Sequence, residues 1–86
     1  MDTVAPRIAK YIEEQFLVIF GEDFDVDTNL FEAGIMDSFG YVQLLGFLQS
    51  EFQLTLEDDE FLTNVMSSLR RMAVAASAKL VQQQER

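Results

Sequence analysis

The sequence predicts a small all-α protein. Three stretches carry apolar residues at spacings of three and four, which is the period of a helix with one buried face. No stretch shows sustained alternation of apolar and polar residues, and no hairpin turn signal is present. The 86 residues suffice for one domain, which we take as residues 1–86, with residues 81–86 expected to fray.

The first predicted helix spans about residues 3–20. Its apolar stripe comprises Val4, Ile8, Ile12, Phe16 and Ile19. Pro6 lies in the first turn, where its missing N–H does no harm, and Gly21 is expected to end the helix. The other apolar residues between Phe16 and Gly21 widen the face and predict burial on more than one side.

A long connection is predicted at residues 21–37. It is acidic, yet apolar side chains recur along it: Phe24, Val26, Leu30, Phe31, Ile35 and Met36. We expect these side chains to pin the connection over the helix ends. A loop longer than about 12 to 15 residues is uncommon in a compact domain and is often functional.

The second predicted helix spans Ser38–Phe52, with Ser38 as its N-cap residue. Its predicted buried face comprises Tyr41, Leu44, Leu45, Leu48 and Phe52. Gly40 and Gly46 each cost about 1 kcal/mol of helix stability relative to alanine, which points to a close approach on that side.

Residues 53–66 form a second connection with one short predicted helix, in which the acids of residues 57–60 precede Phe61 and Leu62. The last helix is expected to begin with Ser67 or Ser68 as its N-cap and to run to about Gln83. Its stripe comprises Leu69, Met72, Ala73, Ala76 and Leu80. The prediction is therefore three main helices and one short helix, with a long loop between the first two.

The composition excludes several function classes. The chain has no cysteine and no histidine, so it cannot form disulfides, thiolate metal sites or a Ser-His-Asp triad. Its many carboxylates lie in solvated acidic runs without a nucleophile beside them. We therefore assign no catalytic residue and no metal ligand, and we expect that the chain is not an enzyme.

The charge indicates the kind of partner. Fifteen acidic and six basic residues give a formal net charge of −9, which disfavours nucleic acid and anionic membranes and favours proteins with basic patches. The acidic N-terminus carries no targeting signal, and the longest apolar run is far too short to span a bilayer. We expect a cytoplasmic monomer without membrane insertion.

The residues from Leu30 to Phe39 carry the functional signal. A glycine, Gly34, is followed by Asp37 and Ser38 at the start of an amphipathic helix. A serine hydroxyl there lies at the positive end of the helix dipole, where free N–H groups favour a phosphate. Asp37 places a carboxylate beside it that could help hold a divalent cation. Taken alone, an Asp-Ser pair is more often a simple helix cap.

The wider context changes that interpretation. Residues 34–39, Gly-Ile-Met-Asp-Ser-Phe, resemble the attachment motif Gly-x-x-Asp-Ser-Leu/Met of acyl carrier proteins and peptidyl carrier domains, with Phe39 in the large apolar position. The resemblance extends upstream through residues 27–31 and covers nearly the whole chain. Downstream it includes Val42, Leu44, Leu48 and Phe52.

This resemblance implies a four-helix bundle of the acyl carrier type. It also implies that Ser38 receives 4′-phosphopantetheine from coenzyme A through a separate phosphopantetheinyl transferase, which needs magnesium near Asp37. The thiol of the arm would carry an acyl or aminoacyl group as a thioester, which explains how a chain without cysteine performs thiol chemistry. A loading ligase or a synthase would be a further partner.

Residues 37–52 look especially like D-alanyl carrier proteins, which an adenylating ligase loads for teichoic-acid modification, whereas residues 64–69 look closer to general acyl carriers. Fatty-acid, polyketide and specialised pathways stay open, and a specialised carrier with a dedicated ligase or synthase is favoured. The expected partner surface on the second helix comprises Phe39, Val42, Gln43 and Gly46. The acids usual there in fatty-acid carriers are absent, and Glu51 is the one charge expected on the exposed face, where Gly40 is also expected.

Two alternatives compete with the carrier hypothesis. The alternating Asp23, Asp25, Asp27 and Asn29 resemble a calcium loop, but Thr28 occupies the required glycine position and Gly34 the required glutamate position. The other alternative is an acidic helical protein-interaction module without a prosthetic group, in which Ser38 is only a cap.

Overall fold

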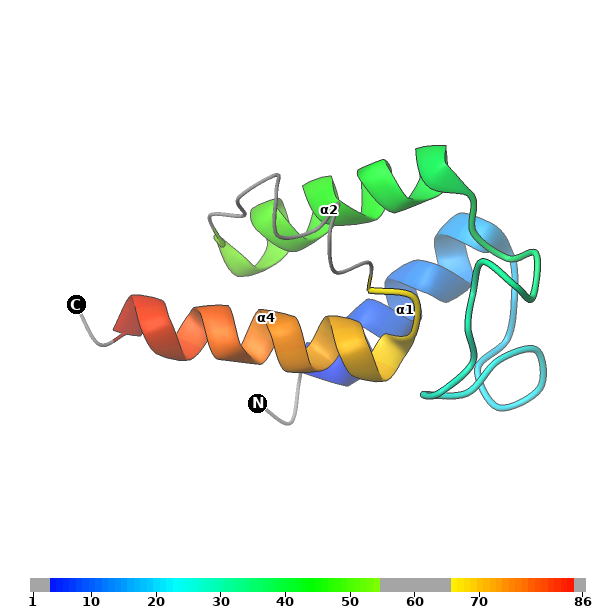
Figure 1. The fold of residues 1–86 in the computed structure, drawn as a ribbon, viewed down its shortest axis with the longest axis horizontal. Coiled ribbons are helices and arrows are strands. Elements are labelled where there is room, and N and C mark those ends of the chain that lie inside the picture. Colours follow the sequence, from blue (N-terminus) through cyan, green and yellow to red (C-terminus); the bar gives the residue numbers. More distant parts are fainter. Residues whose placement is uncertain (1–3, 55–65, 85–86) are drawn as a thin grey trace.

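The computed structural model describes residues 4–54 and 66–84 (Figure 1). Its helices are α1 (Val4–Phe16), α2 (Ser38–Phe52) and α4 (Leu69–Gln84). Within these ranges the chain forms no named strand, and the one isolated bridge joins Phe20 and Phe24. The all-α prediction is confirmed for this part of the chain. The short helix predicted around Phe61 lies outside the described residues.

The connection between α1 and α2 covers one end of the helix bundle. In Figure 1, α1 ends at the same side of the molecule at which α2 and α4 begin, and the connection of residues 17–37 lies over that side. The connection is therefore placed where it can position the first turn of α2. None of the described helices is both long enough and apolar enough to cross a bilayer.

One apolar core unites the three helices and the connection. Its buried members from the helices are Val4, Ile8, Ile12, Tyr41, Leu44, Leu48, Phe52, Leu69, Met72 and Ala76, and those from the connection are Phe24, Leu30 and Met36. Complete burial of a leucine or isoleucine side chain stabilises the fold by about 1.5–3 kcal/mol relative to exposure. The predicted stripes are confirmed except at Ile19, and the apolar residues of the connection pin it to the core as expected.

A row of side-chain contacts joins α1 to α2. In antiparallel order the contacts are Arg7–Glu51, Tyr11–Phe47, Gln15–Gln43 and Phe16–Gly40. The rings of Tyr11 and Phe47 stack with centroids 4.1 Å apart and planes 18° apart. Aromatic pairs of this kind contribute about 0.5–1.5 kcal/mol beyond the area they bury. These contacts fix how α2 lies against α1.

Gly40 is buried, so its expected place on the exposed face of α2 was wrong. A Cβ atom at Gly40 would lie 2.8 Å from Cε1 of Phe16, closer than side chains pack. The missing Cβ lets the Phe16 ring lie against the first turn of α2. The close approach predicted from the two glycines is therefore real at Gly40, whereas Gly46 has open space around it.

The first helix ends four residues earlier than predicted. Leu17, and not Gly21, takes the left-handed conformation that terminates it, with φ of 57°. The N–H of Val18 then donates to the carbonyl of Glu13 at 3.3 Å, which is the closing bond of a Schellman motif. Because leucine rarely adopts a positive φ, a leucine at position 17 gives no sequence signal of a helix end.

Because α1 ends early, most of the apolar residues that follow it are exposed. Leu17, Ile19 and Phe20 are 89%, 52% and 42% exposed, so the wider buried face predicted beyond Phe16 was wrong for them. Val18 is partly buried against the core. The helical spacing no longer applies once the chain has left the helix. The backbone N–H groups of Ile19 and Phe20 instead donate to the carboxylates of Asp23, at 2.7 Å, and Glu13, at 3.0 Å.

The last helix begins after Ser68, the second of the two predicted caps. The Ser68 hydroxyl oxygen accepts a hydrogen bond from the backbone N–H of Arg71 at 3.3 Å. The helix continues to Gln84, past the predicted end at Gln83. Residues 85–86 are not described, and the fraying expected from residue 81 stays a prediction.

The two glycines of α2 give a matched pair for a stability test. We expect Gly46→Ala to raise the free energy of unfolding by about 0.5–1 kcal/mol, because alanine favours the helix and its Cβ meets nothing there. Gly40→Ala should lose that gain, because the Phe16 ring must move. Urea unfolding of both variants measures the difference, and an equal gain at both positions would contradict the close contact.

Candidate functional site

The start of α2 is organised by Asp37. Its carboxylate oxygen Oδ1 accepts a hydrogen bond from the N–H of Gly40 at 2.8 Å, and its carbonyl accepts the first helical bond from Tyr41 at 2.9 Å. Asp37 is therefore the N-cap, and the prediction of Ser38 in that role was wrong by one residue. Both residue types cap helices well, and here the carboxylate is the group that reaches the N–H of Gly40.

Ser38 consequently occupies the first helical position, and its side chain does not cap the helix. Its side chain is exposed, and within the described part of the chain no hydrogen bond engages its hydroxyl. The N–H groups of Ser38 and Phe39 have no acceptor within the helix, because they precede the first helical bond. A phosphate ester on this hydroxyl would lie at the positive end of the helix dipole. The position fits a phosphopantetheine group.

The turn before α2 is built around Leu30. Its side chain is fully buried, and its carbonyl accepts hydrogen bonds from Ile35 at 3.0 Å and Met36 at 3.1 Å. Gly34 supplies the reversal with a φ of 77°, a conformation that glycine adopts without strain. The buried side chain of Met36 then anchors the chain immediately before Asp37. The glycine of the motif thus sets the direction in which α2 begins.

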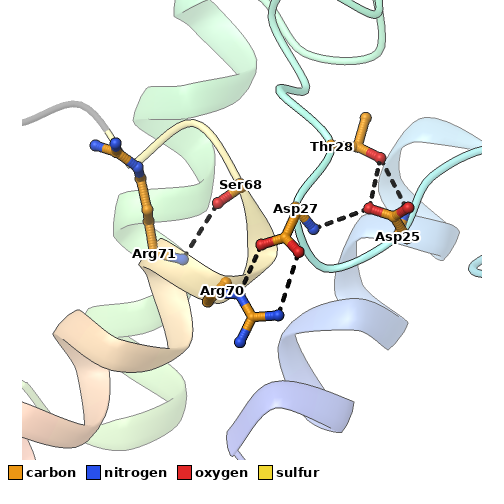
Figure 2. Close-up of polar contacts among 6 residues, drawn as sticks. All are labelled: Asp25, Asp27, Thr28, Ser68, Arg70 and Arg71. Atoms are coloured by element: carbon orange, nitrogen blue, oxygen red, sulfur yellow. Dashed lines mark hydrogen bonds and ion pairs between the residues drawn. The ribbon is translucent and has the colours of Figure 1, made fainter.

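The same connection is bound to the start of α4. The N–H of Leu30 donates to the carbonyl of Ser67 at 2.8 Å, and the N–H of Arg70 donates to that of Val26 at 2.9 Å. Figure 2 shows the Arg70 guanidinium on both carboxylate oxygens of Asp27, at 2.6 and 3.2 Å. The hydrogen bond to Arg70 lowers the pKa of Asp27. These bonds tie the site's supporting turn to a second helix.

Tyr41 links α2 to the segment that precedes α4. Its buried hydroxyl oxygen accepts a hydrogen bond from the N–H of Met66 at 3.0 Å, and its ring meets Phe31 edge to face at 5.6 Å. Burial raises the pKa of Tyr41. The contacts of Tyr41 in the core thus fix the first turn of α2, in addition to the Asp37 cap.

The acidic side chains of the connection do not converge on a cation. Asp25 accepts hydrogen bonds from the N–H of Asp27 at 2.9 Å and the hydroxyl of Thr28 at 3.0 Å (Figure 2), while Asp23 turns to a backbone N–H. The Asn29 amide oxygen accepts the N–H of Phe31 and Glu32. Across residues 4–54 and 66–84, no group of three or more acids could hold a metal ion. The side chains of Asp23, Asp25 and Asn29 thus accept hydrogen bonds in local turns, and that of Asp27 pairs with Arg70 of α4.

All four residues of the expected partner surface are exposed. Phe39 and Val42 are 72% and 64% exposed, and Gln43 and Gly46 lie on the surface of α2 with them. Phe47 is different, because it is half-buried and stacks on Tyr11. Val42 is therefore available at the surface, whereas Phe47 packs against α1.

Comparison with known proteins agrees with this geometry. Residues 7–75 match the family described as Phosphopantetheine attachment site. The chain belongs to this family. Family members are carriers with covalently attached 4′-phosphopantetheine, and this chain is a carrier and not an enzyme. The matched range includes all of α2 and its supporting connection.

Curated relatives of this carrier include several D-alanyl carrier proteins. The one from Streptococcus suis is 41% identical over 58 residues, which is 67% of this chain and 71% of the relative. The one from Lactobacillus delbrueckii is 43% identical over 56 residues, 63% of this chain and 70% of the relative. D-alanyl carrier protein 2 of Lactiplantibacillus plantarum is 36% identical over 63 residues, 71% and 74% of the two chains. No solved structure matches the chain significantly.

Substitutions at Asp37 separate hydrogen bonding from charge at the cap. Asp37→Ala should lower the free energy of unfolding by about 1 kcal/mol, because the N–H of Gly40 loses its acceptor. Asp37→Asn should stay within a few tenths of the parent, since an amide oxygen accepts the same bond. Chemical denaturation measures both, and equal losses would show that Asp37 acts through its charge alone.

Proposed function

We propose that this chain carries an aminoacyl group, with D-alanine as the favoured cargo, on a 4′-phosphopantetheine arm attached to Ser38. The observation that carries the proposal is the exposed, uncommitted hydroxyl at the first position of α2, directly after the capping Asp37. Ser38 lies inside the matched range of the family, and Gly34 and Asp37 precede it at the motif spacing. A separate transferase and a loading ligase are the partners.

The attachment is a transfer between an alcohol and a pyrophosphate. The Ser38 oxygen forms a bond to the β-phosphorus of coenzyme A, the bond from that phosphorus to the bridging oxygen breaks, and adenosine 3′,5′-bisphosphate leaves. The hydroxyl proton passes to a base of the transferase. Ser38 contributes an accessible oxygen, and α2 contributes the dipole that favours the phosphodiester charge.

The cargo assignment draws on the relatives and on the surface of α2. Two of the D-alanyl carrier proteins are 41% and 43% identical to this chain over more than half its length. The exposed face of α2 also lacks the row of acids usual in fatty-acid carriers, and its Glu51 is paired with Arg7. Both points favour a dedicated aminoacyl ligase over the enzymes of fatty-acid synthesis. Once bound, the arm supplies the thiol that holds the cargo as a thioester.

The attachment proposal is tested by intact mass. Incubation with coenzyme A, magnesium and a broad-specificity phosphopantetheinyl transferase should add one phosphopantetheine to the protein. Ser38→Ala should abolish the gain, because the accepting oxygen is gone, whereas Ser50→Ala, an exposed serine of the same helix, should keep it. A gain that persists in Ser38→Ala, or no gain on folded protein, would favour the plain interaction module.

The cargo proposal needs a second step. After arm attachment, a D-alanine-activating ligase with ATP and D-alanine should add one alanyl group that hydroxylamine removes, since thioesters are cleaved by it. The Ser38→Ala variant should gain nothing. Loading by an acyl-transferring enzyme of fatty-acid synthesis with no loading by the ligase would replace the aminoacyl assignment with an acyl one.

A further inference from the structure

Three strongly exposed apolar side chains lie around the start of α2 and the end of α1. Leu17 is 89% exposed, Phe39 is 72% exposed and Val42 is 64% exposed. Single exposed apolar residues are common on any protein surface, but a cluster of them marks an interaction site. We call these three residues the apolar docking surface.

Contacts between the two helices bring these residues to one region. The Phe16 ring lies against Gly40. Phe16 is the last residue of α1 and directly precedes Leu17, and Gly40 directly follows Phe39 on α2. Gln15 donates a hydrogen bond to Gln43, the neighbour of Val42, at 3.3 Å. The end of α1 is therefore fastened beside the first turns of α2. In Figure 1 these two segments lie at the same end of the molecule.

Leu17 does little for the isolated fold. It occupies the left-handed position of a Schellman motif, where glycine removes the steric cost that a leucine meets. With 89% of its surface exposed, its side chain packs against almost nothing. An apolar side chain held outward by the backbone in this way is available to a partner.

The parts of α1 and α2 around the surface carry few charges available to a partner. The exposed residues of α2 near it, Gln43 and Gly46, are neutral, and the carboxylate of Asp37 is engaged by the N–H of Gly40. Glu13, near the end of α1, accepts the N–H of Phe20, which leaves Glu14 as the exposed acid of that turn. A basic patch finds little to pair with here, whereas an apolar patch finds three side chains.

We propose that the enzymes acting at Ser38 dock on Leu17 as well as on Phe39 and Val42, through a patch of their own that is apolar and uncharged. The inference rests on the proposed attachment at Ser38, because an enzyme that reaches this hydroxyl must approach the residues beside it. Because Phe39 directly follows Ser38, the apolar docking surface begins beside the hydroxyl, and this assigns the surface to such an enzyme. Leu17 extends the interface from the second helix to the end of the first.

The test measures how fast the transferase modifies Ser38 at varied carrier concentration. Leu17→Asn keeps the helix end, because asparagine tolerates a positive φ, and should raise KM about tenfold with kcat nearly unchanged. Leu17→Gly, which also fits this backbone, should do the same. The control Val74→Asn changes an exposed apolar residue of α4 and should leave KM unchanged. Valine and asparagine have similar helix propensities, so α4 should not be disturbed. For the parent, KM should change little between about 0.05 and about 0.5 M salt.

The outcomes separate this inference from the attachment proposal. No modification of the parent would overturn attachment, and the docking inference with it. Normal modification with equal KM for the parent and both Leu17 variants would overturn only the docking inference. A steep rise of KM with salt would assign recognition to the acidic connection instead. A parent dimer in sedimentation that Leu17→Asn dissolves would assign the surface to a second copy of the chain.

Discussion

The hydrogen bond from the N–H of Gly40 to the carboxylate of Asp37 is the interaction on which the site depends. Because Asp37 caps α2, the neighbouring Ser38 does not have to, and its hydroxyl stays exposed at the positive end of the helix. Gly40 is also packed against α1, because a Cβ atom there would lie only 2.8 Å from Cε1 of Phe16. Asp37 thus caps the helix, and the proposed attachment uses the adjacent Ser38.

The rest of the fold holds this helix start in place from three directions. The buried residues of α2 pack in the core, and the stacking of Tyr11 on Phe47 joins α2 to α1. The connection before Asp37 is hydrogen-bonded to the start of α4. A chain of 86 residues without cysteine or histidine has little chemistry of its own. In the phosphopantetheine-attachment family the prosthetic group supplies the thiol, so the protein's task is to present it to other enzymes.

The sequence predicted the parts of this structure that depend on local spacing. The bounds of α2 and the buried stripes follow from apolar periodicity and were correct except at Ile19, and the apolar Leu30 and Met36 pin the connection to the core as expected. The end of α1 did not follow, because Leu17 adopts a conformation that its residue type does not signal, while Gly21, the apparent stop, serves a later turn. Two features needed three-dimensional information: which of two adjacent capping residues reaches the N–H of Gly40, and which distant ring approaches Gly40.

The central claim concerns the hydroxyl at the start of α2, and peptide mass mapping of the protein isolated from its own host tests it most directly. The account predicts that phosphopantetheine is found on the peptide that contains Ser38 and on no other, with an alanyl thioester on part of the population. Phosphopantetheine on another residue, or an unmodified Ser38 in cells whose other carriers are modified, would contradict it.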